Sequence, residues 1–135
     1  MNSIIVDTNV LVRFLVGDDK QQNKIAERLF ETVEEIIIPT HVFCELVWVL
    51  LSVYKSRPEE VHAKICGIIK SRKVVVRNDE IEAGLQMMEK GGDFADGVNA
   101  YSGEIMAHGP SVFISFDRQA VRLLAKQGIS ALVPE

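Results

Sequence analysis

Two aspartates stand just behind short apolar runs of this 135-residue chain. The β-branched run at 4–6 leads directly into Asp7, and the run at 111–115 is followed, one residue later, by Asp117. In an open parallel sheet, ligands bind beyond the carboxyl ends of the strands, so both carboxylates are candidates for a site there. Helix capping explains either of them as well, because Asp accepts hydrogen bonds from the free amides of a helix N-terminus.

Glu45 and Asp96 are carboxylates within apolar surroundings. Glu45 interrupts the apolar stretch 42–54, so little of that helix is expected to face water. Burying an ionised carboxylate without a partner is costly, so Glu45 should point to a cation, a hydrogen-bond donor or a polar cleft, and a salt bridge to an arginine would also satisfy it. Around Asp96 we expect Asp93 to cap the helix, which leaves Asp96, nearly one turn further on, for chemistry.

A cluster of these four carboxylates would repel itself unless a cation occupied its centre. Hard divalent cations such as Mg²⁺ and Mn²⁺ accept all-oxygen sites, keep several waters and share phosphate oxygens with a substrate. Such a site predicts phosphodiester hydrolysis, in which metal activates water and neutralises charge on the departing oxygen. His41, His62 and His108 form no ligand motif and are interpreted as surface or packing residues.

Short apolar runs alternate with longer helical patterns along the whole chain. The expected strands lie at 3–6, 35–39, 73–76, 111–115 and 130–133. The expected helices lie at about 9–16, 20–32, 40–54, 58–71, 79–90, 94–107 and 118–127. This alternation predicts an α/β fold with a mainly parallel sheet covered by helices, in one domain that spans residues 1–135.

The composition limits the possible partners. With 47% hydrophobic residues, the chain can bury a sizeable core, and its net charge of −4 argues against a broadly basic surface for nucleic acid. A nucleic-acid substrate would therefore need bound metal cations or local basic patches. Candidates for contact with an RNA backbone, which solvated helix faces explain nearly as well, are Arg13, Lys20, Lys24, Arg118 and Arg122.

The cysteines and the hydropathy indicate a cytoplasmic protein. Cys44 and Cys66 lie in apolar segments without a CxxC pattern, so we expect buried thiols in a reducing compartment. The apolar stretch 42–54 is shorter than the roughly 20 residues that a membrane-spanning helix needs. The first residues also lack the basic region and long apolar core of a signal peptide, so no membrane association is expected.

Four motifs, taken in order, resemble those of one protein family. They are IIVDTNVLVR (4–13), PTHVFCELVWVL (39–50), DFADGVNA (93–100) and FISFDRQ (113–119). Their order and spacing over nearly the whole chain resemble PIN-domain ribonucleases, and specifically the VapC-type toxins of bacterial toxin–antitoxin pairs. The resemblance implies a three-layer α/β/α sandwich with a central, mainly parallel sheet.

The resemblance also implies a site and partners. The catalytic acidic quartet would be Asp7, Glu45, Asp96 and Asp117. Within it, Mg²⁺ or Mn²⁺ would be held by Asp7, Asp96 and Asp117, and supporting polar positions would be Thr8, Asn9 and Ser115. The implied activity is metal-dependent endoribonuclease cleavage of single-stranded or loop RNA. The implied partners are a small antitoxin protein, whose tail crosses the active-site groove, and a second copy in a homodimer, with a larger assembly also open.

Two positions depart from the family pattern. Ser115 stands where many relatives carry threonine, which keeps the hydroxyl group. Gln119 replaces an acid that is often found two residues after the last aspartate, which speaks against a fifth acidic ligand.

Two readings from other classes stay open. A haloacid dehalogenase-like phosphatase also begins with an apolar strand and an aspartate, but it usually carries a second aspartate two residues later, where this chain has Asn9. A phospho-aspartate trapped at Asp7 would favour that reading. A non-catalytic protein-binding module, in which the acids only cap helices, would bind no metal, and its Asp→Asn variants would have no effect on RNA.

Overall fold

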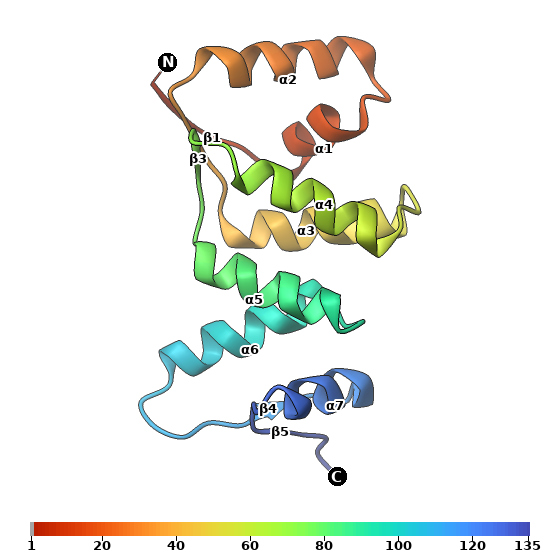
Figure 1. Cartoon of the computed structure of the whole chain (residues 1–135), viewed down its shortest axis with the longest axis vertical. Coiled ribbons are helices and arrows are strands. Elements are labelled where there is room, and N and C mark those ends of the chain that lie inside the picture. Colours follow the sequence, from red (N-terminus) through yellow and green to blue (C-terminus); the bar gives the residue numbers. More distant parts are fainter. Residues whose placement is uncertain (1) are drawn as a thin grey trace. The chain divides into compact units, whose positions relative to one another are not determined.

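The computed structural model describes residues 2–135, which divide into two compact units, the first ending at Asn78 and the second spanning Asp79–Glu135. Helices and strands alternate within both units (Figure 1). Each strand pairing in the part of the chain described is parallel, which confirms the predicted α/β class.

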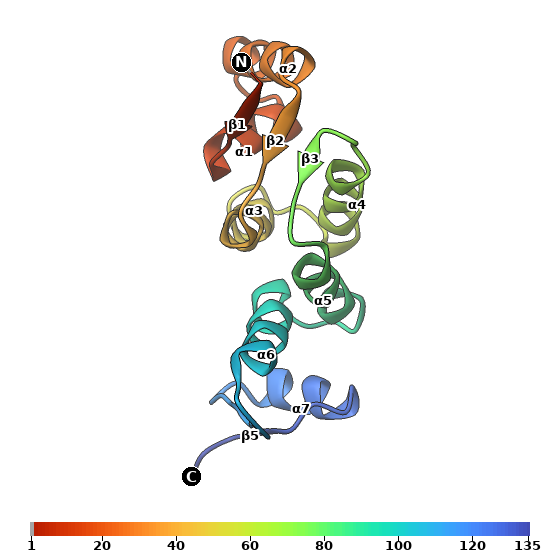
Figure 2. The same ribbon diagram turned by 90° about the vertical axis from the view of Figure 1, so that its left-hand side faces the viewer.

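The first unit contains a three-stranded sheet in the order β1-β2-β3, with Ile4 opposite Ile36 and Ile36 opposite Val74. Figure 2 shows the three strands side by side. The elements of this unit are β1 (Ser3–Ile5), α1 (Thr8–Val16), α2 (Lys20–Thr32), β2 (Glu35–Ile37), α3 (Thr40–Ser52), α4 (Pro58–Ile69) and β3 (Val74–Val75).

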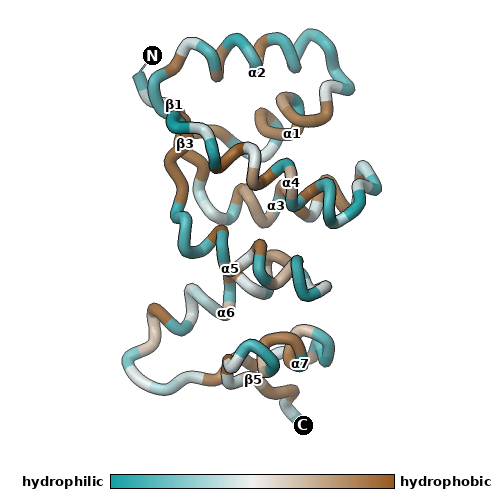
Figure 3. Tube along the Cα trace, viewed as in Figure 1, coloured by the Kyte–Doolittle hydropathy of each residue, from teal (hydrophilic) through white to brown (hydrophobic). Residues whose placement is uncertain are grey.

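Hydropathy separates the helices of the first unit. The tube in Figure 3 is largely hydrophobic along α1 and largely hydrophilic along α2. Within α2, Ala26 alone is buried. Helix α3 instead buries a broad stripe that includes Phe43, Leu46 and Leu50. The apolar stretch of the sequence is therefore a core helix, as its length suggested. Among residues 2–135, no helix combines the length and the hydropathy needed to cross a membrane.

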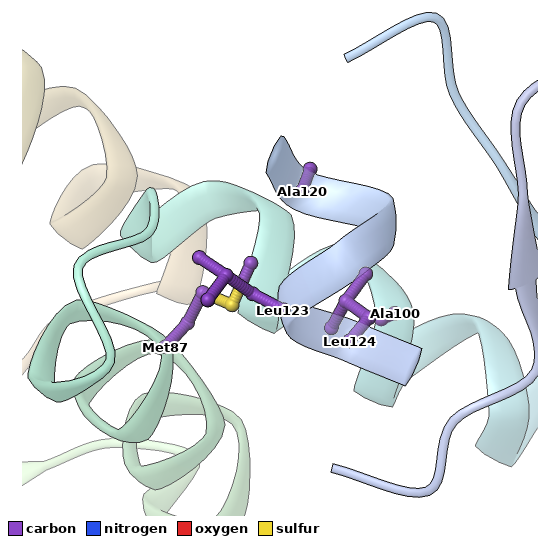
Figure 4. Packing of buried hydrophobic residues seen from close by; sticks show 5 residues of the cluster. All are labelled: Met87, Ala100, Ala120, Leu123 and Leu124. Atoms are coloured by element: carbon purple, nitrogen blue, oxygen red, sulfur yellow. The ribbon is translucent and has the colours of Figure 1, made fainter. Parts of the chain in front are cut away.

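The second unit joins its elements around a small apolar cluster. Helix α5 starts at the last residue of the first unit, and β4 pairs with β5, with Phe113 opposite Ala131. The elements are α5 (Asn78–Glu89), α6 (Phe94–Met106), β4 (Phe113–Ile114), α7 (Arg118–Lys126) and β5 (Ala131–Leu132). Figure 4 shows the buried cluster, which brings together Met87, Ala100, Ala120, Leu123 and Leu124.

The strands and helices lie where the sequence predicts them, and their ends differ from the prediction by at most two residues. The strand predicted at 35–39, for example, is paired over Glu35–Ile37, and the helix predicted at 40–54 ends at Ser52. The prediction that both cysteines are buried was wrong: Cys44 and Cys66 are thiols of intermediate exposure. Each cysteine lies beside the buried face of its helix, Cys44 on α3 and Cys66 on α4. The Cys66 Sγ atom lies 3.6 Å from the His62 Nδ1 atom.

Helices α5 and α6 approach closely at Gly97. A Cβ atom at this position would lie 2.5 Å from the Ala83 carbonyl oxygen and 2.7 Å from the Met87 Cβ atom. We therefore predict that Gly97→Ala lowers the free energy of unfolding by about 1–3 kcal/mol, because the added methyl group overpacks this contact. The control is Gly103→Ala in the same helix, where nothing lies within 4 Å of the added Cβ.

Since alanine is a better helix former than glycine, the Gly103→Ala control should be more stable than wild type by roughly 0.5–1 kcal/mol. Urea denaturation of both variants makes the comparison. Equal effects of the two substitutions would contradict the close packing at Gly97.

Candidate active site

Asp7 lies in the turn between β1 and α1, where it caps the helix. Its backbone is extended, and its Oδ1 atom accepts a hydrogen bond from the Val10 N–H at 3.1 Å. The side chain is exposed, and the cap uses one of its two carboxylate oxygens. Thr8 and Asn9 follow as the first residues of α1. The capping interpretation of Asp7 is confirmed, and the other carboxylate oxygen, Oδ2, is available for chemistry.

Asp117 has an equivalent place in the second unit, between β4 and α7. Its Oδ1 atom accepts a hydrogen bond from the Ala120 N–H at 3.1 Å, so it caps α7. The Ser115 Oγ atom accepts a hydrogen bond from the Asp117 N–H at 3.0 Å, which fixes the turn that carries the carboxylate. Gln119, which replaces the fifth acid, donates to the Gly91 carbonyl at 3.4 Å. Both aspartates thus follow a strand and start a helix, as their positions in the sequence predict.

Asp96 is half-buried in the first turn of α6. Burial raises its pKa above the ordinary aspartate value, and the nearby carboxylates of Asp93 and Asp117 raise the pKa further. Asp93 caps α6 by accepting a hydrogen bond from the Ala95 N–H at 3.1 Å. The predicted cap at Asp93 is confirmed, and the chemical role of Asp96 stays a prediction. The second unit therefore holds three carboxylates that repel one another through Asp96.

The predicted burial of Glu45 was wrong. Glu45 is exposed on α3, and so are His41 and Trp48, which lie one turn before it and one turn after it. These positions share one face of the helix, while Phe43 and Leu46 occupy the buried face. The apolar neighbours of Glu45 in the sequence belong largely to that other face, so its carboxylate stays in water without a cost of desolvation.

The four predicted acids are divided between the two units. Asp7 and Glu45 belong to the first unit, where α1 packs against α3, and Asp96 and Asp117 belong to the second. Among residues 2–135, no three His, Cys, Asp or Glu side chains are grouped closely enough to hold a metal ion. The convergence of all four carboxylates therefore stays a prediction.

Arg13 belongs to a polar network that sequence reasoning missed. Its Nη1 atom donates to Asp18 Oδ1 at 3.0 Å, its Nε atom donates to Gln22 Oε1 at 2.7 Å, and the Tyr54 hydroxyl donates to Asp18 Oδ2 at 2.9 Å. The Tyr54 hydrogen bond is the main reason that the pKa of Asp18 lies below its ordinary value. The nearness of Asp18 to Arg13 in the sequence was the available signal, whereas Tyr54 is 36 positions away from Asp18.

Comparison with protein-family models gives one decisive match. The model of the PIN domain aligns with residues 4–124, a range that includes all four predicted acids. The chain belongs to the PIN-domain family. Neither the curated proteins nor the solved structures give a match. The resemblance noted from the four motifs is thus confirmed for the family, and with the parallel strands the match confirms the predicted PIN-like α/β/α fold class.

Membership of the PIN family indicates a nuclease, and nucleases of this family commonly depend on divalent metal ions. The donor chemistry of the PIN domain fits such an ion. Its candidate ligands Asp7, Asp96 and Asp117 offer oxygen atoms alone, which hard cations such as Mg²⁺ prefer. The repulsion that raises the pKa of Asp96 is the second sign of fit, because a bound cation would relieve it.

Proposed function

We propose that this PIN domain is a Mg²⁺- or Mn²⁺-dependent endoribonuclease and acts in the cytoplasm as the toxin of a VapBC-type toxin–antitoxin pair. The observation that carries the proposal is the placement of Asp96, half-buried beside two further carboxylates, in a chain whose match to the PIN family spans all four acidic positions. A half-buried acid among like charges has a raised pKa, and groups perturbed in this way cluster at functional sites, which favours a catalytic role for Asp96.

Each carboxylate has a distinct part in the proposed mechanism. Asp7, Asp96 and Asp117 would hold the metal ion, which when bound activates water and neutralises charge on the departing oxygen. Glu45 is exposed and would accept a hydrogen bond from the attacking water, which orients it toward phosphorus. The capping bonds of Asp7 and Asp117 fix their backbones, and the Ser115 hydroxyl holds the turn before Asp117.

The direct test is cleavage of 5′-labelled single-stranded RNA by the purified protein in Mg²⁺ or Mn²⁺, resolved on a denaturing gel. We expect internal cuts that yield shorter labelled fragments. The same preparation is given p-nitrophenyl phosphate and is analysed for covalent phosphate. If the RNA stays intact while p-nitrophenyl phosphate is hydrolysed and Asp7 becomes phosphorylated, the nuclease proposal is wrong and the protein is a phosphatase.

An apolar groove in the first unit supports the proposed antitoxin. This groove, with a volume of about 800 Å³, lies between α1, α2 and α4, and Leu15 is part of its lining. Phe14 and Phe30 also line it, and the centroids of their two rings lie 4.7 Å apart. Lys64 and Glu27 also line it, so an amphipathic segment could pair charges there while it buries apolar side chains. We propose this groove as the antitoxin site. Loss of co-purification of the protein encoded by the neighbouring reading frame on Leu15→Lys would support it, and unchanged co-purification would contradict it.

Exposed apolar side chains near the C-terminal end of α3 support the proposed homodimer. Trp48 is 63% exposed on this helix, and Val53, the first residue after the helix, is 59% exposed. Tryptophan is enriched among the residues that dominate binding at protein interfaces, so an exposed tryptophan is a candidate anchor for such a contact. We therefore predict that the wild type is a dimer and that Trp48→Ala weakens it at least about tenfold, which corresponds to a loss of ~1.4 kcal/mol.

Light scattering over a range of concentrations measures this dimerisation. Ile25→Ala serves as the control, because Ile25 is 56% exposed but lies on α2. A monomeric wild type, or equal dimerisation of wild type and Trp48→Ala, would refute the interface on α3.

A further inference from the structure

A second, smaller depression lies between α1 and α2, next to Asp7. Its volume is about 380 Å³, within the range of roughly 300–1,000 Å³ that is typical of small-ligand sites. Asp7 and Arg13 line it from the side of α1, and Gln22, Ile25 and Leu29 line it from the side of α2. The residues on α2 are three and four positions apart, so they share the helix face that packs toward α1. The depression therefore belongs wholly to the first unit.

The polar side of this depression is held in place by its own hydrogen bonds. The Arg13 Nε atom donates to Gln22 Oε1 at 2.7 Å, and the Asp18 carboxylate accepts from Arg13 Nη1 at 3.0 Å. Because the Gln22 oxygen accepts from Arg13, the group that Gln22 offers to a ligand is its amide nitrogen, a donor of two hydrogens. The hydrogen bond from Arg13 thus fixes the orientation of the Gln22 amide beside the depression.

Beyond Gln22, the lining that α2 contributes is apolar and partly open. Ile25 is 56% exposed there, beside the half-buried Leu29 and the buried Ala26. A ligand with a flat apolar face and a polar edge would cover Ile25 and meet the donors at the same time. Unpaired bases of RNA have this shape, and proteins recognise them by contacts to the face and by hydrogen bonds to the edge.

Charge favours a base over a phosphate in this place. Arg13 is already paired with Asp18, and the remaining charged group of the lining is the Asp7 carboxylate. Because Arg13 is already paired, the depression itself offers a phosphate no free cation, whereas a base is neutral and needs none. Arg13, considered from the sequence as a contact for the RNA backbone, is therefore better placed to orient Gln22.

We propose that the depression between α1 and α2 is the subsite for an unpaired nucleobase next to the phosphate that the PIN domain cleaves. This inference rests on the proposed ribonuclease function, because Asp7 both lines the subsite and belongs to the proposed catalytic quartet. The Gln22 amide donor selects bases with a carbonyl acceptor, so guanine and uracil bind in preference to adenine, which has none. Gln22 and Ile25 are thus specificity-determining residues.

Cut sites mapped by sequencing of a randomised single-stranded RNA test the specificity. The wild type should cut next to one class of base, and the Gln22→Ala and Ile25→Ala variants should lose about tenfold or more of that preference. The matched control is Arg28→Ala, an exposed residue of the same helix that does not line the depression; it should keep the preference. A preference that is the same in all four proteins would overturn the subsite.

A binding experiment separates this inference from the proposed function. ¹⁵N-labelled wild-type protein in EDTA is titrated with GMP, UMP and AMP and followed by NMR. Shifts of the Gln22 side-chain amide and of the Ile25 backbone amide, larger for GMP and UMP than for AMP, support the subsite even if no RNA is cut. RNA cleavage without any shift at these residues would overturn the subsite and leave the nuclease intact.

Discussion

Replacing Asp96 by asparagine is expected to abolish RNA cleavage while the metal-free protein stays as stable as the wild type or becomes more stable. Asparagine keeps the shape of the side chain and removes one negative charge. The loss of a group that holds the catalytic cation should lower kcat by at least about a hundredfold, the scale seen when an electrostatic contact to a transition state is removed. A structural carboxylate would show the reverse pattern, with activity kept and stability lost.

The environment of Asp96 sets the expected effect on stability. Burial first, and then repulsion by Asp93 and Asp117, raise its pKa above the ordinary aspartate value. The folded protein therefore binds a proton at Asp96 more tightly than the unfolded chain does, and wild-type stability falls as the pH rises through the raised pKa. At neutral pH the ionised carboxylate opposes folding. Asp96→Asn removes this opposition, so its advantage over the wild type should be largest at neutral pH and should shrink toward acid pH.

Melting curves at several pH values, with no metal present, measure this difference. Asp93→Ala provides the structural comparison, because it removes the cap of α6 and should cost about 1 kcal/mol. If Asp96→Asn melts well below the wild type at neutral pH, Asp96 holds the fold together, and its assignment to the active site is wrong.

Removal of divalent metal should have an effect as large as the loss of Asp96. With Mg²⁺ or Mn²⁺ chelated, the carboxylates have no means of stabilising the charge that develops at phosphorus, so cleavage should stop and should return when metal is restored. Metal should also stabilise the folded wild type. A ligand at about 100 times its Kd adds about 2.7 kcal/mol if it binds the folded state alone.

Thermal melts of wild type and Asp96→Asn over a range of Mg²⁺ concentrations test the binding without reference to RNA. The wild type should gain stability with Mg²⁺, and the variant should gain clearly less. Cleavage that continues at full rate in excess chelator would contradict a metal-dependent mechanism, and so would equal stabilisation of both proteins.

The order of helices and strands could be predicted because the local signals agree. Residues 4–6 are β-branched and Asp7 follows them, so a strand, a cap and a helix come in sequence. The same logic predicted the end of β4 and the cap at Asp117. Element ends were less predictable, since a strand lasts as long as its neighbour pairs with it. The strand expected at 73–76 is paired over Val74–Val75.

The candidate site was predictable in part. That Asp93 caps and Asp96 does not follows from their spacing in α6. The exposure of Glu45 was missed, although the spacing of His41, Glu45 and Trp48 along one helix face was visible in the sequence. The depression beside Asp7 had no comparable signal. It depends on how α1 and α2 pack and on the hydrogen bond between Arg13 and Gln22. These two residues are nine positions apart and lie on different helices, so the sequence alone does not show that they meet.

The most direct test compares two helix caps of the first unit. Asp7 caps α1 through Val10 at 3.1 Å, and Asp19 caps α2 through Gln22 at 3.0 Å. Asparagine caps helices about as well as aspartate, so neither Asp7→Asn nor Asp19→Asn should change stability much. RNA cleavage in Mg²⁺ by the wild type and both variants is the measurement. We predict that Asp7→Asn loses cleavage and that Asp19→Asn keeps it; equal activity of the two variants would mean that Asp7 is a cap and no more.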